Sequence, residues 1–113
     1  MAIAVVSERL AIQAASGEVG DIGNNVLITP TKGQKLRLFY CSYNPSGGVE
    51  AAFRLGSTGE LFLRNKLTVG GSVIAKDIGD LRYLEGSVDA PLILNLSAAV
   101  TTIWNAFYVE TNE

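Results

Sequence analysis

The stretch Val49–Leu55, Val-Glu-Ala-Ala-Phe-Arg-Leu, decides the fold class, because apolar side chains recur at every second position and the largely polar set Glu50, Ala52 and Arg54 lies between them. A period of two is that of a β-strand with one buried face. Gly56–Gly59 then supplies turn residues, and the next stretch alternates again. We therefore predict a β-hairpin whose second strand is Glu60–Arg64. In that strand Leu61 and Leu63 are expected to point opposite to Phe62.

Short segments of the same kind lie on both sides of this hairpin. Glycine, proline, serine and asparagine separate them, and these residues favour turns. Counting the hairpin, about eight strands fall within about ninety residues, which is the spacing of a jelly roll or an immunoglobulin-like sandwich. We predict an all-β, single-domain antiparallel sandwich of one of these two types. The other predicted strands are Val26–Thr29, Lys35–Tyr43, Ser72–Ala75, Arg82–Glu85, Leu92–Ser97 and Thr101–Glu110.

Alternation also predicts which side chains share a face in the longer segments. Both faces of Lys35–Tyr43 are apolar or aromatic, so we expect this strand to be central and covered on both sides. The sets predicted to share a face are Leu92 with Leu94 and Leu96, Leu36 with Leu38 and Tyr40, Phe39 with Cys41 and Tyr43, Ile103 with Phe107 and Val109, and Trp104 with Ala106 and Tyr108.

The N-terminal segment is ambiguous. Apolar residues in Ala2–Ala15 fit a helix and a strand about equally, and the segment could also be an extended arm. We assign residues 1–24 to an N-terminal arm or first strand with a Gly-rich linker, and residues 25–113 to the sandwich domain. The glycines at positions 17, 20 and 23 lack the Lys-Ser/Thr of a phosphate-binding loop, so we predict that they form turns.

Composition limits the classes of partner. The chain has 113 residues, of which 48% are hydrophobic and only 18% charged, and this low charge suggests that part of the surface faces another protein. Its net charge is −2, and lysine and arginine form no basic stripe, so we expect no nucleic-acid partner. No apolar run reaches the roughly 18 residues of a membrane span, and the start lacks the basic residues of a signal peptide. We expect no membrane partner and synthesis in the cytoplasm.

Composition also limits the chemistry. Histidine is absent, which removes the usual general base near neutral pH and the commonest metal ligand. Cys41 is the single cysteine, so no disulfide forms within the chain, and the serines and threonines have no evident base to activate them. We expect a protein that is not an enzyme and that uses no cofactor.

Two groups of side chains are candidates for a ligand site. The first is a set of carboxylates that could hold Ca²⁺, although their spacing matches no defined calcium loop: Asp77, Asp80, Glu85 and Asp89. Solvated loop carboxylates are the other interpretation. The second is the set of aromatic residues Tyr43, Tyr83 and Trp104, which could stack on a sugar ring if exposed but equally suit a core or a subunit interface.

Over residues 25–110 the sequence resembles small virion proteins of tailed bacteriophages, most closely the capsid decoration (cement) proteins. The segments that carry the resemblance are Gly33–Tyr40, Phe53–Phe62, Pro91–Ser97 and Phe107–Glu110. These are hydrophobic strand patterns and contain no chemical signature. The resemblance implies a β-sandwich, often trimeric, on the outer surface of the capsid where capsomers meet.

The resemblance therefore implies the major capsid protein as partner, a homotrimer, and a virion location. An N-terminal arm would add contact area across a seam between capsid subunits. The residues predicted to contact the partner are Ile3, Val5, Val6, Leu10, Ile12, Tyr43, Tyr83 and Trp104. The alternative is a tail-associated module that binds a receptor or carbohydrate through the same three aromatic residues.

Overall fold

The structure, a computed structural model, describes residues 12–59, 61–71, 73–77 and 83–112. These residues contain nine β-strands. No helix occurs among these residues, so the all-β prediction is confirmed. The strands are β1 (Gln13–Val19), β2 (Gly23–Ile28), β3 (Lys35–Pro45), β4 (Val49–Leu55), β5 (Phe62–Leu67), β6 (Ile74–Asp77), β7 (Leu84–Glu85), β8 (Leu92–Leu96) and β9 (Thr102–Thr111).

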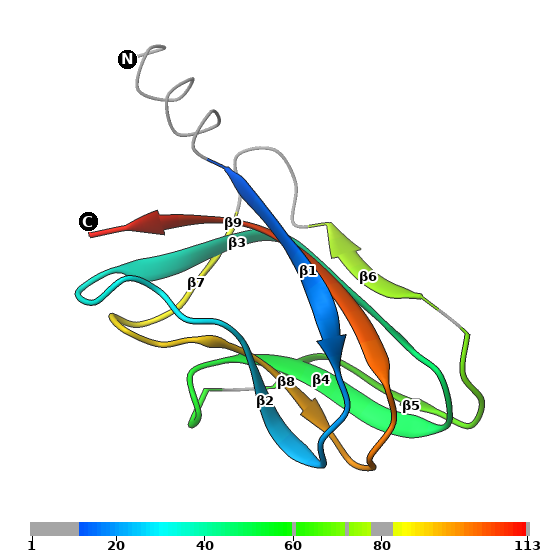
Figure 1. Cartoon of the computed structure of the whole chain (residues 1–113). Coiled ribbons are helices and arrows are strands. Elements are labelled where there is room, and N and C mark those ends of the chain that lie inside the picture. Colours follow the sequence, from blue (N-terminus) through cyan, green and yellow to red (C-terminus); the bar gives the residue numbers. More distant parts are fainter. Residues whose placement is uncertain (1–11, 60, 72, 78–82, 113) are drawn as a thin grey trace.

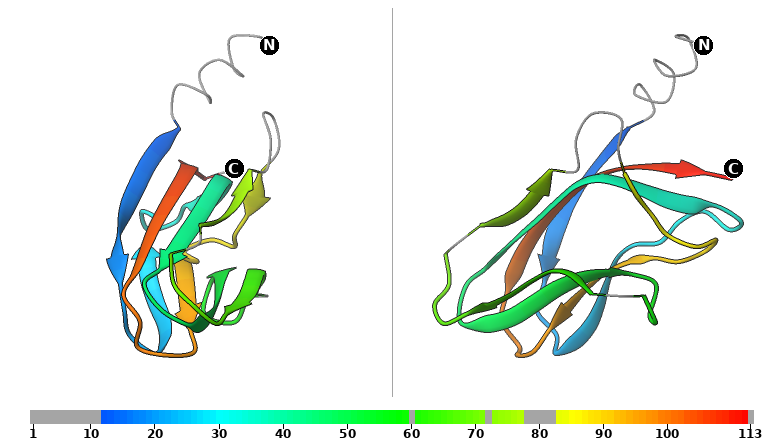
Figure 2. Two further views of the ribbon diagram at one scale, coloured as in Figure 1. Left: turned by 90° about the vertical axis from the view of Figure 1, so that its right-hand side faces the viewer. Right: turned by 180° about the vertical axis from the view of Figure 1, so that it is seen from behind.

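The strands form two antiparallel sheets that face each other (Figures 1 and 2). Sheet A has the order β1-β9-β3-β6, with the short β7 also pairing with β3, and sheet B has the order β2-β8-β4-β5. The pairs are nested along the chain: β4 pairs with β5, β3 with β6, β2 with β8 and β1 with β9. A long hairpin rolled up in this way is a jelly roll, which decides between the two predicted sandwich types.

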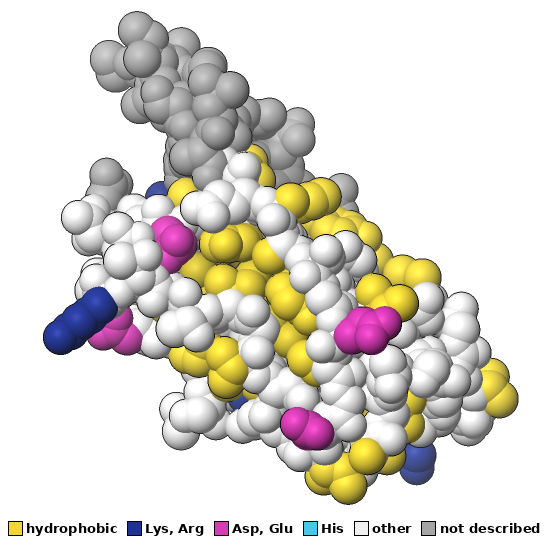
Figure 3. All heavy atoms as spheres, in the orientation of Figure 1, with side chains coloured by type: hydrophobic (Ala, Val, Ile, Leu, Met, Phe, Trp, Pro, Cys, Tyr) yellow, Lys and Arg dark blue, Asp and Glu magenta, His cyan; other side chains and the backbone are white. Residues whose placement is uncertain are grey.

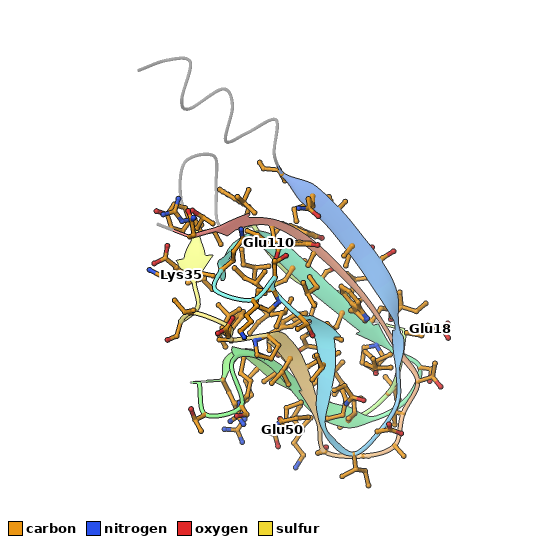
Figure 4. All side chains as sticks on the ribbon, turned by 60° about the vertical axis from the view of Figure 1, so that its left-hand side comes forward. Glu18, Lys35, Glu50 and Glu110 are labelled. Atoms are coloured by element: carbon orange, nitrogen blue, oxygen red, sulfur yellow. The ribbon has the colours of Figure 1, made fainter. Side chains whose placement is uncertain are left out.

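The core lies between the two sheets, where side chains from both fill the space (Figure 4). Leu92, Leu94 and Leu96 of β8 are at most 1% exposed and belong to it, as their alternation predicts. From β4, Phe53 is fully buried and its ring packs against the rings of Tyr43 and Phe62, with centroids 5.5 and 5.8 Å away. The predicted faces of these two strands are therefore confirmed.

A β-bulge in β3 changes the faces predicted for that strand. The register with β9 shifts between Leu38 and Tyr40, so Phe39 is an extra residue without a counterpart on β9. Leu36 and Leu38 face the core together with Cys41 and Tyr43, whereas Tyr40 points outward and contacts Phe107. The prediction that Tyr40 shares a face with Leu36 and Leu38 is wrong, because a bulge reverses the alternation that follows it.

A second bulge changes which side chains of β5 face the core. The register with β4 shifts between Ala51 and Phe53, and Leu63 has a positive φ of 54°. As a result Phe62, which stacks on Phe53, and Leu63 both pack against the core, so the prediction that these two side chains point to opposite sides is wrong. Alternation cannot foresee a residue in this backbone conformation.

Of the alternatives left open for residues 1–24, a first strand agrees with β1, and both β1 and β2 are strands of the sandwich, in sheets A and B. The predicted domain boundary at residue 25 falls inside β2. Gly17 lies within β1 and forms no turn. A Cβ at this position would lie 3.2 Å from the indole Nε1 of Trp104. Gly23 has a φ of +93°, which is a backbone conformation that glycine favours. The residues of the predicted arm that precede Ile12 lie outside the described residues.

Candidate partner-binding face

The outward side of sheet A carries almost no charge where β1, β9 and the second half of β3 lie side by side. Partner positions across β1, β9 and β3 form three rows of outward side chains, which we call the neutral face. Its rows are Ala14-Phe107-Tyr40, Ser16-Asn105-Ser42 and Glu18-Ile103-Asn44. Glu18 is the one charged residue among these nine, and it points away from the sandwich at one end of the face (Figure 4).

Large apolar side chains are exposed on and beside this face. Phe107 is 44% exposed and Ile103 47%, and Phe107 packs its ring against Tyr40 with centroids 5.3 Å apart. Ile12, which directly precedes β1, is 37% exposed. Single exposed apolar residues are normal on a protein surface, but several on one nearly uncharged sheet face are typical of an interaction site.

The outward side of sheet B differs in its chemistry. Glu50 and Arg64 form an ion pair there, and the Arg54 guanidinium donates a hydrogen bond to the carbonyl of Ser57. The amide of Asn95 donates to Oδ1 of Asn24 over 2.8 Å. These groups are charged or already hydrogen-bonded, as expected of a face turned to water. Of the two outward faces, the neutral face is therefore the better candidate for a protein partner.

A cluster of charged and aromatic residues lies at one end of sheet A, where β7 pairs with β3. Glu85 accepts a hydrogen bond from Nε of Arg37 over 2.8 Å and lies 3.6 Å from Nζ of Lys35. The Arg37 guanidinium carbon lies 4.6 Å from the ring centroid of Tyr83, and this ring meets Phe39 edge-on. Tyr83 is 38% exposed, so its ring is accessible to a partner.

Tyr43 and Trp104 do not lie at the surface, so the expectation that they present their rings to a partner is wrong. Tyr43 is 1% exposed and Trp104 6%, and both belong to the core between the sheets. Burial raises the pKa of Tyr43 to about 12. The prediction that Trp104 lies on the opposite side of β9 from Ile103 and Phe107 is nevertheless confirmed, and the structure shows that the side of Trp104 is the inward one. Asn105, a polar residue in step with Ile103 and Phe107, is the signal that marks their face as the outer one.

Tyr43→Phe should lower the free energy of unfolding by about 1 kcal/mol, because the buried hydroxyl lies 2.8 Å from the carbonyl oxygen of Leu63 and 3.1 Å from that of Ala51. Urea denaturation measures this loss. Tyr40→Phe, on the partly exposed outer side of the same strand, is the matched control and should change stability much less. Equal losses in the two variants would contradict the assignment of Tyr43 to the core.

Glu85→Gln should make the free energy of unfolding depend less on pH in the acidic range. The hydrogen bond from Arg37, helped by the charge of Lys35, holds the pKa of Glu85 below its usual value of 4.5. A lowered pKa in the folded state stabilises the fold above the ordinary pKa, and this contribution is lost as the pH falls through the lowered value. Denaturation at a series of acidic pH values should therefore show a shallower decline for Glu85→Gln than for the wild type. Glu18→Gln, which removes an exposed carboxylate of β1, is the control for the change of charge itself.

A pocket of about 330 Å³ lies at the end of the sandwich near β7, lined mainly by Leu55, Leu61, Phe62 and Leu84.

Of the four predicted calcium-ligand candidates, Glu85 is paired with arginine and Asp89 accepts a hydrogen bond from the backbone N–H of Gly33 over 2.6 Å. Asp80 lies outside the described residues. Within the described ranges no three histidine, cysteine or acidic residues are grouped to hold a metal ion. Nor does that part of the chain contain a helix long and apolar enough to cross a membrane.

Comparisons with known proteins add a structural likeness. No protein-family model matches the chain, and no curated protein matches it. Among solved structures, the chain is similar to a protein in the cryo-electron microscopy structure of the virus-like particle of extra small virus from the giant freshwater prawn Macrobrachium rosenbergii. The two share 9% identity over 90% of this chain and 80% of that chain, with a TM-score of 0.45. At this level the likeness carries no inference about function.

Proposed function

We propose that this chain is a non-catalytic structural protein of a phage virion, which binds the outer surface of the capsid and stabilises contacts between major capsid subunits. The observation that carries the proposal is the neutral face. Its exposed Phe107 and Ile103 lie on a sheet face where Glu18 is the one charged residue. Association with another protein over such a face is favourable, because apolar surface leaves water and almost no charge has to be desolvated.

The architecture suits this role. A jelly roll is a common architecture of virus capsid proteins, although it also occurs in lectins and enzymes, so the fold alone does not assign the function. The resemblance to decoration proteins supplies the virion and the major capsid protein as partner. The homotrimer that it implies stays a prediction of the resemblance, and the absence of an enzymatic activity or cofactor stays a prediction from the composition.

Capsids that lack the protein test the proposal directly. Purified chain should co-sediment with expanded capsids and raise the temperature at which they break open, because a partner that binds only the assembled state stabilises it. Failure to co-sediment with capsids of the parent phage, under conditions where the purified chain is folded, would contradict the capsid role.

The alternative role, a receptor- or carbohydrate-binding module, keeps one of its three aromatic candidates at the surface. Tyr83 is exposed beside Arg37, whereas Tyr43 and Trp104 are buried. Binding to a glycan array that is lost in Tyr83→Ala, together with failure to bind capsids, would favour this alternative. The same two assays therefore separate the two functions.

A further inference from the structure

Strand β1 is a free edge of sheet A. Among the strands that the structure describes, β1 pairs with β9 alone, and all seven of its residues follow one unbroken register from Gln13 to Val19. A regular edge strand presents backbone N–H and C=O groups to solvent, which is a template for pairing with another strand. Figure 3 looks onto this edge and shows hydrophobic side chains gathered beside β1 in the space between the sheets.

The other outer strands carry features that discourage such pairing. Strand β5 contains the bulge at Leu63 and exposes Arg64 and Lys66. The register of β2 with β8 shifts between Val26 and Ile28, and β6 has only four residues. Bulges, charged side chains and shortness are the usual protections of a sheet edge. β1 has no proline, lysine or arginine and no shift in its register with β9.

We propose that β1 pairs with β1 of a second copy of this chain, antiparallel and about a two-fold axis that passes through Ser16. This register uses the whole strand, because Gln13 then lies opposite Val19 of the second copy and Ala14 opposite Glu18. A two-fold axis makes the contact self-complementary, so the same strand serves both copies. The pairing does not depend on the proposed capsid role.

The side chains of β1 suit this register. On the outer side, Ser16 meets Ser16 of the second copy, and Glu18 meets the methyl group of Ala14. The two glutamates are then separated along the strands by four residues, about 14 Å, which exceeds the screening length of about 8 Å at physiological salt. On the inner side Ala15 meets Gly17. Small side chains meet across the axis, and no like charges face each other directly.

The pairing joins the two A sheets into one continuous sheet and places two neutral faces side by side. The resulting particle is a dimer and not the homotrimer that the resemblance implies. The mass of the full chain in solution therefore separates the two. Sedimentation equilibrium should give the mass of a dimer, and a monomer or a trimer would overturn the proposal.

A cysteine at the axis tests the register. Directly opposite residues in an antiparallel pair have Cα atoms about 4.5–5.5 Å apart, which is within the range that a disulfide spans. Under mild oxidation, Ser16→Cys should form a disulfide-linked dimer in most of the protein. Ser57→Cys, at an exposed position of the turn after β4, is the matched control and should remain mostly unlinked. Native Cys41 is fully buried in both variants. Equal linkage in the two variants would overturn the register.

A charge exchange tests the same register without oxidation. Ala14→Glu places two like-charge pairs against Glu18 of the other copy, and each such pair opposes association. The dissociation constant of the dimer should rise about ten-fold, and Glu18→Lys in the same chain should reverse that rise. Because Ala14 is exposed, thermal unfolding at low concentration should show that both variants fold. A dissociation constant that does not respond to Ala14→Glu, or a rise that Glu18→Lys does not reverse, would contradict the proposed pairing.

Discussion

Trp104→Ala is expected to lower the free energy of unfolding by about 3–5 kcal/mol, a large part of the total stability of a domain of this size. The indole is 6% exposed and packs beneath Gly17 of β1, in the core that both sheets share. Removing the indole leaves a cavity beneath β1. The regular pairing of β1 with β9 opposes the backbone movement that would close this cavity. Chemical denaturation of the variant measures the loss.

Ile103→Ala is the matched control for this loss. Ile103 is the neighbour of Trp104 on β9, but it points outward and is 47% exposed. Its truncation should cost less than about 1 kcal/mol. If Trp104→Ala were folded and as stable as Ile103→Ala, Trp104 would not be a core residue, and its predicted role as a surface stacking platform would need to be reconsidered.

Phe107→Glu is expected to weaken binding to the capsid by at least about 100-fold. Phe107 lies in the neutral face and is 44% exposed, so in the complex its ring would be covered by the partner. A glutamate in its place would bring an unpaired charge into an apolar contact, and the cost of removing that charge from water opposes association. Thermal unfolding should show a folded protein, since the substituted side chain points away from the core.

Local alternation predicts from sequence which side chains share a face in β4, β8 and β9, because the extra residue at each register shift lies in a neighbouring strand and not in these three. The same rule fails in β3 and β5. There an extra residue at Phe39 and the unusual backbone of Leu63 reverse the alternation, and neither position has the glycine that would signal a bulge.

The candidate site is harder to predict from sequence than the fold. Tyr43 and Trp104 are as compatible with a binding surface as with a core, and only their packing between two sheets decides. The neutral face depends on three strands that are distant in the sequence, since Ala14 and Tyr40 lie on either side of Phe107 only after the chain has rolled up. A single strand pattern contains no information on which strands become neighbours.

One binding titration tests most directly whether the chain acts through the neutral face of sheet A. Wild-type protein, Phe107→Glu and Val26→Glu are titrated against capsids that lack the protein. Val26 is 57% exposed and pairs with Ile93 on the outward side of sheet B, so the same charge is introduced on the opposite face. We predict that Val26→Glu binds as the wild type does and that Phe107→Glu does not bind. Loss of binding in Val26→Glu, with Phe107→Glu unaffected, would contradict the assignment of the partner site to sheet A.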